Sequence, residues 1–207
     1  MIGVKRIKMR KVFEITNKNI INDVIQKAEY GTLALCMDNK PYSIPINFVE
    51  LDGEVFFHGA KKGKKIEVIK NNSNASFSVV EDYSLLPSYF STDTGTACPA
   101  TQLYKSVILD GQIQFVEDYE EKANALETLM KKLQKEGKYI PLNHEMYKKA
   151  ITAVCIYKLV PTTISAKFGL GQHFNKERYE RVIRHLEERG TKKDLETLSL
   201  IKEFYKK

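Results

Sequence analysis

The chain has 207 residues, which is enough for one domain, or one domain with an appendage, and for a sizeable buried core. Its 43% hydrophobic and 29% charged residues are ordinary for a soluble globular protein. No apolar run approaches the roughly 20 residues that span a bilayer, and the basic N-terminus lacks the apolar segment of a secretory signal. We therefore expect a cytoplasmic protein with no membrane partner.

The net charge of +7 raises the alternative of a nucleic-acid partner. Basic residues gather near the N-terminus (Lys5, Arg6, Lys8, Arg10, Lys11), over 61–70 and in the C-terminal segment. In the C-terminal segment arginines alternate with glutamates, which is typical of a solvated helix face. No nucleic-acid recognition motif accompanies the charge, so we do not favour this alternative.

The cysteines and histidines show neither a disulfide nor a metal pattern. Cys36, Cys98 and Cys155 are odd in number and widely separated. Cys36 and Cys155 lie in apolar runs and are expected to be small core residues. The four histidines lack the spacing of metal ligands, so the sequence predicts no metal site.

The first half of the chain reads as alternating helix and strand signals. Apolar residues at helical spacing predict a helix over 19–27, capped by Thr16 or Asn17. The following predicted elements are strands over 32–37, 42–49 and 54–58, a helix over 63–70 and a strand over 75–80. Because turn residues separate the first three strands, including Asp52-Gly53, we expect an antiparallel meander.

The second half continues with a long polar-aromatic loop over 81–101. The further predicted elements are a strand over 103–115 with a bulge or turn at Asp110-Gly111, a helix over 119–135, a short helix over 146–150, a strand over 151–166 and two C-terminal helices. The apolar stripe expected on helix 119–135 is Ala123, Leu126, Met130 and Leu133; those expected on the last two helices are Tyr179, Val182, Ile183 and Leu186, and Leu195, Leu198, Ile201 and Tyr205. The pattern predicts a mainly β fold, a six- to seven-stranded antiparallel barrel with helices outside.

The segment 55–66 has the composition of a phosphate site. A buried strand ends in a turn with Gly59, Ala60 and Gly63 and runs into a helix start with four lysines. Small residues let a ligand approach the backbone, free N–H groups at the helix start donate, and ammonium groups neutralise charge. Together these residues suit a dianionic phosphate ester, although lysine runs are usually solvated. We expect Lys61 and Lys62 to be solvated, because two lysines usually suffice for one phosphate.

Four local patterns, at Ile15–Leu35, Pro41–Phe48, Phe57–Lys65 and Cys98–Val107, occur in an order that resembles a known superfamily. It is the flavin-binding split-barrel superfamily that contains pyridoxamine 5′-phosphate oxidase, and the chain is most similar to its nitroimidazole-resistance branch. The resemblance covers about 10–168. It implies an FMN-binding split-barrel domain over 10–168, followed by a helical extension over 169–207.

The resemblance also implies a homodimer that binds FMN in a groove between subunits. In that arrangement Tyr42, Ile44, Pro45, Ile46 and Asn47 would run along the isoalloxazine ring; His58, Gly59 and Ala60 would lie beside the ribityl phosphate; Lys64 and Lys65 would pair with the phosphate; and Tyr104 and Ser106 would approach the ring or the substrate. Alternatives to these flavin contacts stay open. Tyr42 and Phe57 could belong to the core or to the dimer interface, and His58 could be a strand-end histidine whose hydrogen bonds are made within the protein. Pro45 predicts an edge or a bulge in its strand.

Two departures from the oxidase narrow the function. The chain has no Trp, and its last strand ends Ser165–Gly169 without the basic, Trp-bearing segment of the oxidase, so oxidase activity itself is not expected. We expect an FMN-dependent oxidoreductase of the nitroreductase kind, with NAD(P)H or another donor and a small planar acceptor; His58 and Tyr104 are the only catalytic candidates. The alternative is a non-catalytic FMN or heme protein, with His173 or His185 as the heme ligand.

Overall fold

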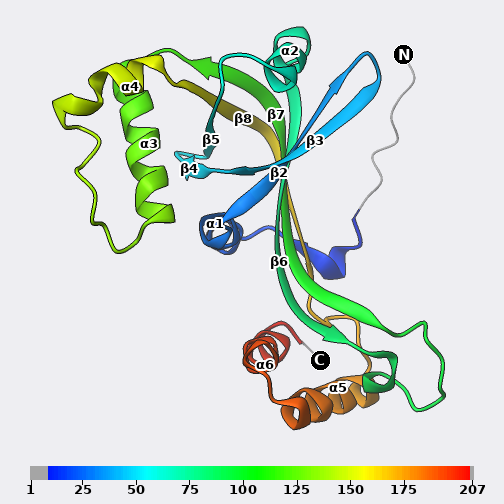
Figure 1. The fold of residues 1–207 in the computed structure, drawn as a ribbon. Helices are drawn as coiled ribbons and strands as arrows, with labels where there is room; N and C mark the ends of the chain where they lie inside the picture. The colour runs from blue at the N-terminus through cyan, green and yellow to red at the C-terminus, as the bar shows by residue number, and fades with distance from the viewer. Residues whose placement is uncertain (1–8, 206–207) are drawn as a thin grey trace. The chain divides into compact units, whose positions relative to one another are not determined.

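The computed structural model describes residues 9–205 (Figure 1). Lys5, Arg6 and Lys8 of the basic N-terminal group lie outside them. The strands are β1 (Glu14–Ile15), β2 (Tyr30–Met37), β3 (Lys40–Asn47), β4 (Val49–Leu51), β5 (Glu54–Gly59), β6 (Asn74–Leu86), β7 (Thr101–Val116) and β8 (Cys155–Gly169). The helices are α1 (Lys18–Lys27), α2 (Lys64–Asn71), α3 (Tyr119–Leu133), α4 (Lys148–Ala153), α5 (Lys176–Arg189) and α6 (Lys192–Phe204), with short 3-10 helices η1 (Lys11–Phe13), η2 (Ser88–Phe90) and η3 (Glu145–Tyr147).

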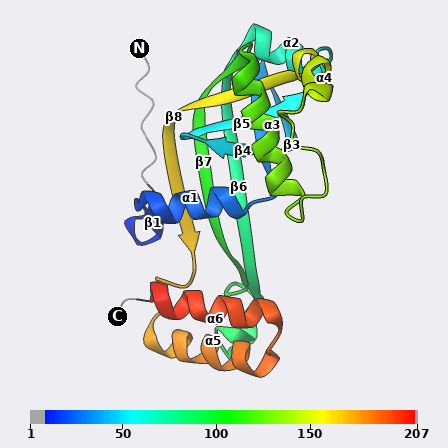
Figure 2. The same cartoon turned by 90° about the vertical axis from the view of Figure 1, so that its left-hand side faces the viewer.

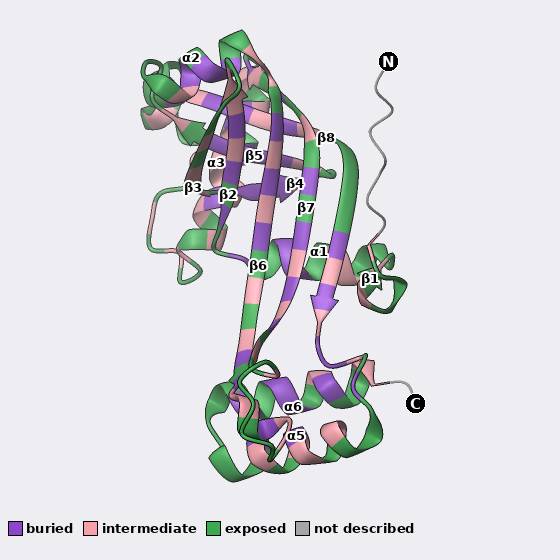
Figure 3. Ribbon diagram, turned by 90° about the vertical axis from the view of Figure 1, so that its right-hand side faces the viewer, coloured by how far each residue is buried: buried purple, intermediate pink, exposed green. Residues whose placement is uncertain are grey.

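A single sheet joins the strands in the order β3-β2-β6-β7-β8-β5-β4, with β1 paired to β8. The pairs β1–β8, β2–β3, β2–β6, β4–β5 and β5–β8 are antiparallel. Buried and less buried residues alternate along the strands, as expected when one face packs on a core (Figure 3). The predicted class, a mainly β antiparallel split barrel with flanking helices, is confirmed.

The chain folds into two compact units. Among the described residues, unit 1 comprises 9–21, 80–106 and 165–205, and unit 2 comprises 22–79 and 107–164. Strands β6, β7 and β8 contribute residues to both units. The predicted division at residue 168 between a barrel domain and a helical extension stays a prediction.

Tight turns form in unit 2 where the sequence predicted them. Asp38 and Asn39 have φ of 52° and 60°, and Asp52 and Gly53 have φ of 52° and 85°, the left-handed conformations that two-residue hairpin turns need. The predicted meander, however, is wrong, because β3 pairs only with β2 and β5 pairs with β4 and β8. The strand expected over 42–49 is divided at the fully buried Phe48 into β3 and β4, and only the residues after Phe48 pair with β5.

Helix α3 packs against β4 and β5 in unit 2. Its buried residues are Lys122, Ala125 and Leu129, whereas Leu133 of the predicted apolar stripe is 48% exposed. The core at this contact consists of Val49, Phe56, Val116, Ala125, Leu129 and Ile156. Of the predicted stripe, Leu126 packs at the edge of this core, Ala123 and Met130 are half-buried, and only Leu133 is wrong. Contact with the sheet, and not hydropathy alone, selects the buried face.

Two predicted element boundaries are also wrong. The loop expected over 81–101 begins late, because β6 continues to Leu86 and η2 follows it. The last strand begins at Cys155 and not at Ile151, since 148–153 form α4. Cys36 and Cys155 were both expected in the core, and both are only half-buried. No helix among residues 9–205 is long and apolar enough to cross a membrane.

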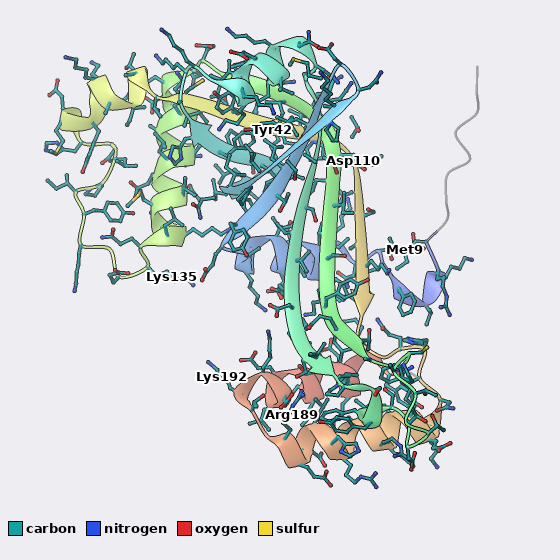
Figure 4. The ribbon with its side chains drawn as sticks, turned by 45° about the vertical axis from the view of Figure 1, so that its right-hand side comes forward. Met9, Tyr42, Asp110, Lys135, Arg189 and Lys192 are labelled. Carbon is teal, nitrogen blue, oxygen red and sulfur yellow. The ribbon has the colours of Figure 1, made fainter. Side chains whose placement is uncertain are left out.

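Helices α5 and α6 lie side by side in unit 1 (Figure 2). Val182, Leu186, Leu198 and Ile201 are buried as predicted, but Leu195 is 57% exposed and buried Asp194 takes its place. The Asp194 carboxylate accepts from Arg189 at 2.6 and 2.9 Å and from Ser84 Oγ at 2.6 Å. Figure 4 shows Arg189 and Lys192 at the turn between the helices. The ion pair joins α5 to α6, and the hydrogen bond from Ser84 ties α6 to β6.

Candidate functional site

The candidate phosphate turn of unit 2, residues 58–65, joins β5 to α2. At the end of β5, Gly59 is paired with Cys155 of β8. Gly63 caps α2 with φ of 115°, a conformation that favours glycine, and its carbonyl accepts from the N–H groups of Ile66 and Glu67 at 3.0 and 3.2 Å. The predicted helix start is therefore confirmed. The N–H groups of Lys64 and Lys65, which open the helix, have no preceding turn to accept from them, as at any helix start.

Each of the two lysines that open α2 lies over an aromatic ring. Lys64 Nζ is 4.6 Å from the ring centroid of Tyr42, which Figure 4 marks on β3. Lys65 Nζ is 5.1 Å from the ring centroid of Tyr157 and 5.7 Å from that of Phe57. The rings of Phe57 and Tyr157 are stacked, with centroids 5.3 Å apart. These cation–π contacts hold each ammonium group over its own ring or ring pair.

Gly59 lets Lys65 lie directly against the backbone. A Cβ built on Gly59 would meet Lys65 Nζ and would lie 3.1 Å from Lys65 Cε and 3.4 Å from Tyr157 Cε2. The Tyr157 hydroxyl donates to the carbonyl oxygen of Ala60 at 2.9 Å, which fixes the turn on β8. The glycine is needed for a close approach, as the sequence suggested, but the closest group is this chain's own lysine.

The turn carries positive charge without an acidic counterpart. Among residues 9–205, no carboxylate oxygen lies within 4.0 Å of the ammonium groups of Lys61, Lys62, Lys64 or Lys65. Burial lowers the pKa of Lys65, partly offset by Cys155. Burial, and then the charge of Lys65, lowers the pKa of His58, so its imidazole is neutral at pH 7. An anion at this turn would relieve the repulsion, so these residues fit a phosphate ester.

Strand β3 is an edge strand, as Pro45 predicted. Tyr42, Ile44 and Ile46 are half-buried and share a face with buried residues of β2, while Pro45 and Asn47 are exposed on the opposite face. Asn47 Nδ2 donates to the Glu29 carbonyl oxygen at 3.1 Å. The five predicted ring-contacting residues therefore divide between two faces of one strand.

Tyr104 and Ser106 belong to unit 1, whereas the turn residues 58–65 belong to unit 2. Ser106 Oγ donates to the Lys167 carbonyl oxygen at 3.1 Å. A Cβ built on Gly169 would lie 3.1 Å from the Tyr104 ring. The structure thus brings these two residues together with the end of β8, and their approach to a flavin stays a prediction.

Sequence reasoning missed Tyr157 and Cys155, which line the phosphate turn from β8. Tyr157 is fully buried and Cys155 is half-buried. Neither belongs to a local motif, and the strand that contains them was predicted to start four residues early. Among residues 9–205, no group of three or more His, Cys, Asp or Glu side chains is arranged to hold a metal ion.

The sequence matches one family of known proteins. A family model described as pyridoxamine 5′-phosphate oxidase matches residues 17–168, and no curated protein matches the chain.

Similar solved structures include a candidate 5-nitroimidazole antibiotic resistance protein from Bacteroides thetaiotaomicron, 22% identical with a TM-score of 0.60, covering 74% of this chain and 85% of that one. An FAD and heme binding protein from Mycobacterium smegmatis is 18% identical with a TM-score of 0.61, covering 75% and 72%. The flavocytochrome Anf3 from Azotobacter vinelandii is 17% identical with a TM-score of 0.65, covering 85% and 79%. At these identities the three structures show a shared fold. The family match spans well over half of the chain, which therefore belongs to the pyridoxamine 5′-phosphate oxidase family.

Proposed function

We propose that the protein is a flavoprotein that binds FMN with its phosphate at the turn of residues 58–65. The observation that carries the proposal is this turn. It has two ammonium groups held over aromatic rings, a close approach at Gly59 and no acidic partner among residues 9–205, in a chain of this family. Lys64 and Lys65 would pair with the phosphate, and His58 and Ala60 would lie beside the ribityl chain. The Tyr42–Asn47 strand would run along the ring.

We also propose that the protein is a cytoplasmic oxidoreductase of the nitroreductase kind. Likeness to a candidate 5-nitroimidazole resistance protein supports a small planar acceptor, and NAD(P)H is the proposed donor. When bound, the flavin would supply the two-electron chemistry, while the protein binds, orients and controls access. His58, neutral at pH 7 because its pKa is lowered, can exchange a proton through its imidazole nitrogens. It is a catalytic candidate together with Tyr104.

A homodimer is part of the proposal, and an uncharged sheet face in unit 2 supports it. The paired residues on the outer face of β2, β3 and β6 are Tyr30, Thr32, Ala34, Cys36, Pro41, Ser43, Pro45, Asn47, Ser76 and Ser78. Not one of these ten carries a charge, in a chain with 29% charged residues, and Tyr30 is 62% exposed. Depletion of charge marks the centre of protein interfaces. Thr32→Glu, at the middle of this face, should shift the sedimentation coefficient from dimer to monomer.

The test of flavin binding is direct. Purified protein titrated with FMN should show bound-flavin absorption near 375 and 450 nm, roughly the peaks of oxidised flavin. The double variant Lys64→Ala/Lys65→Ala should weaken FMN binding by at least about tenfold, because it removes one or more charge-assisted contacts to the phosphate. Its riboflavin binding should be unchanged. A wild-type protein that takes up no FMN would refute the proposal. Bound FMN without turnover of NADH or NADPH would refute the enzyme part alone.

The second candidate is a flavin or heme carrier without turnover. Similarity to an FAD and heme binding protein and to a flavocytochrome favours it. Of the two candidate heme ligands, His185 stacks on Phe90 with ring centroids 4.7 Å apart, and its Nδ1 lies 3.3 Å from Glu188 Oε2. His173 is exposed and contacts the rings of Phe13 and Phe174. A Soret band near 400 nm, roughly as in other heme proteins, that is lost in His173→Ala or His185→Ala would support this candidate.

A further inference from the structure

In unit 1, one face of α5 contacts the connection between β6 and β7 (Figure 1). Arg178, Arg181, His185 and Arg189 follow one another at intervals of three and four residues, so they share that face of the helix. We call these four residues the basic stripe. The sequence predicted a solvated helix face for the arginines of this segment, but the side chain of Arg181 is only 18% exposed. The basic stripe is therefore a contact surface.

One guanidinium of the basic stripe joins the two ends of the loop over 91–99. Arg178 Nε donates to Ser91 Oγ at 3.1 Å, and Arg178 Nη2 donates to the Pro99 carbonyl oxygen at 3.2 Å. The same guanidinium lies 4.0 Å from the ring centroid of Phe174, a cation–π contact that fixes its position. Because both hydrogen bonds have a charged donor, each is stronger than a neutral one. Removing this one side chain therefore frees the loop at both ends.

The middle of the loop is held to α5 by an ion pair. Arg181 Nη2 lies 2.6 Å from Asp93 Oδ1 and 2.7 Å from Asp93 Oδ2. Asp93 is the one acidic residue between Ser91 and Ala100. Its side chain is 75% exposed, so salt weakens this pair.

The loop has little structure of its own. Residues 91–100, all within the described part of the chain, lie in neither helix nor strand, and residues 93–98 are all exposed. The bonds that it makes within itself are short-range: Thr94 Oγ1 lies 3.1 Å from Thr92 Oγ1 and 2.9 Å from Thr96 Oγ1. Local opening occurs in segments with few buried contacts. The contacts to α5 therefore decide whether this loop stays in place.

The residue that precedes the loop is fixed independently of it. Phe90 is buried and stacks on His185 with ring centroids 4.7 Å apart, and the Arg189 guanidinium lies 4.8 Å from the Phe90 ring centroid. Arg189 also pairs with Asp194 and donates to the Leu85 carbonyl oxygen at 3.0 Å. Since none of these contacts involves residues 91–100, η2, α5 and α6 can keep their places when the loop moves.

The two strands that hold Tyr104 both connect to Arg178. The loop ends directly before β7, on which Tyr104 lies. Phe174, the ring under Arg178, lies five residues after Gly169 at the end of β8, and a Cβ built on Gly169 would lie 3.1 Å from the Tyr104 ring. A change in the contacts of Arg178 therefore reaches both neighbours of Tyr104.

We propose that residues 91–100 form a lid, which Arg178 and Arg181 hold closed against α5 and which opens as one unit beside Tyr104. The opening itself does not depend on the proposed function. Its effect on substrate access rests on that function, because Tyr104 is a candidate site residue only in the flavoenzyme. The C-terminal helices would then control the lid, a role outside the part of the chain that matches the family.

The test is hydrogen exchange of the peptide over 91–100, measured by mass spectrometry after millisecond mixing. Arg178→Gln should speed this exchange at least about tenfold, the loss of one charge-assisted hydrogen bond, while exchange in α5 and α6 stays within about twofold. Asp93→Asn breaks the ion pair without changing α5 and should have a smaller effect in the same direction. Added salt should speed the exchange of wild type but not of Asp93→Asn. Lys176→Gln, the control, removes one positive charge from the same helix at an 86% exposed site and should change nothing.

The activity measurement separates the lid from the flavin proposal. In FMN-loaded protein, Arg178→Gln should raise KM for a nitroaromatic acceptor at least about threefold and leave FMN affinity unchanged. If wild type binds no flavin, the proposed function fails, and hydrogen exchange alone decides on the lid. Unchanged exchange of 91–100 in Arg178→Gln, or an equal increase in α5 and α6, would overturn the lid. If that variant does not fold, Asp93→Asn decides by the same criteria. Faster exchange with an unchanged KM would overturn the role of the lid in access.

Discussion

Replacing Gly59 by alanine should weaken FMN binding by displacing a lysine and not by disturbing the fold. The added Cβ would meet Lys65 Nζ and approach Lys65 Cε to 3.1 Å. Gly59 does not have a positive φ, so alanine adds no backbone strain. Because the obstructing atoms are the far end of a flexible side chain, they can move at little cost to stability. The ammonium group then leaves its place over Tyr157.

The magnitude follows from the contact that is lost. A charge-assisted phosphate contact contributes about 1.5–3 kcal/mol, so Lys65→Ala should weaken FMN binding by about 10–150-fold. Gly59→Ala should have a smaller effect in the same direction, since the displaced ammonium group stays nearby. In the Lys65→Ala background, Gly59→Ala should change little, because nothing remains to be displaced. The two substitutions should therefore be coupled by about 1–2 kcal/mol.

The assay is a double-mutant cycle of FMN dissociation constants, measured by fluorescence quenching at constant ionic strength. Riboflavin, which lacks the phosphate, is the matched control ligand, and its affinity should not respond to either substitution. Thermal unfolding checks that all four proteins are equally folded. Additive effects of Gly59→Ala and Lys65→Ala on FMN binding would refute the reasoning, as would an equal loss of riboflavin affinity.

Three further predictions concern stability. Asp194→Asn removes the carboxylate of a buried ion pair with Arg189 and should cost about 3 kcal/mol at pH 7 in urea unfolding. Because Arg189 and the hydrogen bonds to this carboxylate hold its pKa far below the usual value, that stabilisation is present above about pH 4 and is lost as the pH falls toward the lowered pKa; a difference that stays constant down to pH 2 would contradict this reasoning. Lys132→Met should stabilise the protein by about 1 kcal/mol at pH 7, because burial lowers the pKa of Lys132 to about 8 over the Phe48 ring. Between pH 8 and about pH 10 the folded protein loses the Lys132 proton while the unfolded chain still keeps it, so wild-type stability should rise. A stabilisation by Lys132→Met that does not shrink over that interval would contradict this reasoning. Gly111→Ala drives a Cβ into the β8 backbone and should cost about 1–3 kcal/mol; an unchanged melting temperature would show that the strands can separate there.

The sequence predicted the parts of the site that depend on neighbouring residues. The turn at Asp52-Gly53, the start of α2 after Gly63 and the edge position of Pro45 are all confirmed. Each rests on backbone preferences or missing hydrogen-bond donors within a few residues. Asn17 likewise caps α1, accepting from the N–H groups of Asn19 and Ile20 at 3.0 and 3.4 Å. The lysines of the phosphate turn could be read from the sequence for the same reason.

Only the tertiary structure decided what those lysines contact. The pairing of β5 with β8 joins segments about a hundred residues apart and places Tyr157 beneath Lys65. The meander was predicted because turn residues separate the strands, yet β3 and β4 lie at opposite ends of the strand order. The buried face of α3 was set in the same way, by the strands against which it packs. Which strands pair and which helix face is buried depends on surfaces that are distant in the sequence and must be buried together. The hydropathy of one segment does not identify those surfaces.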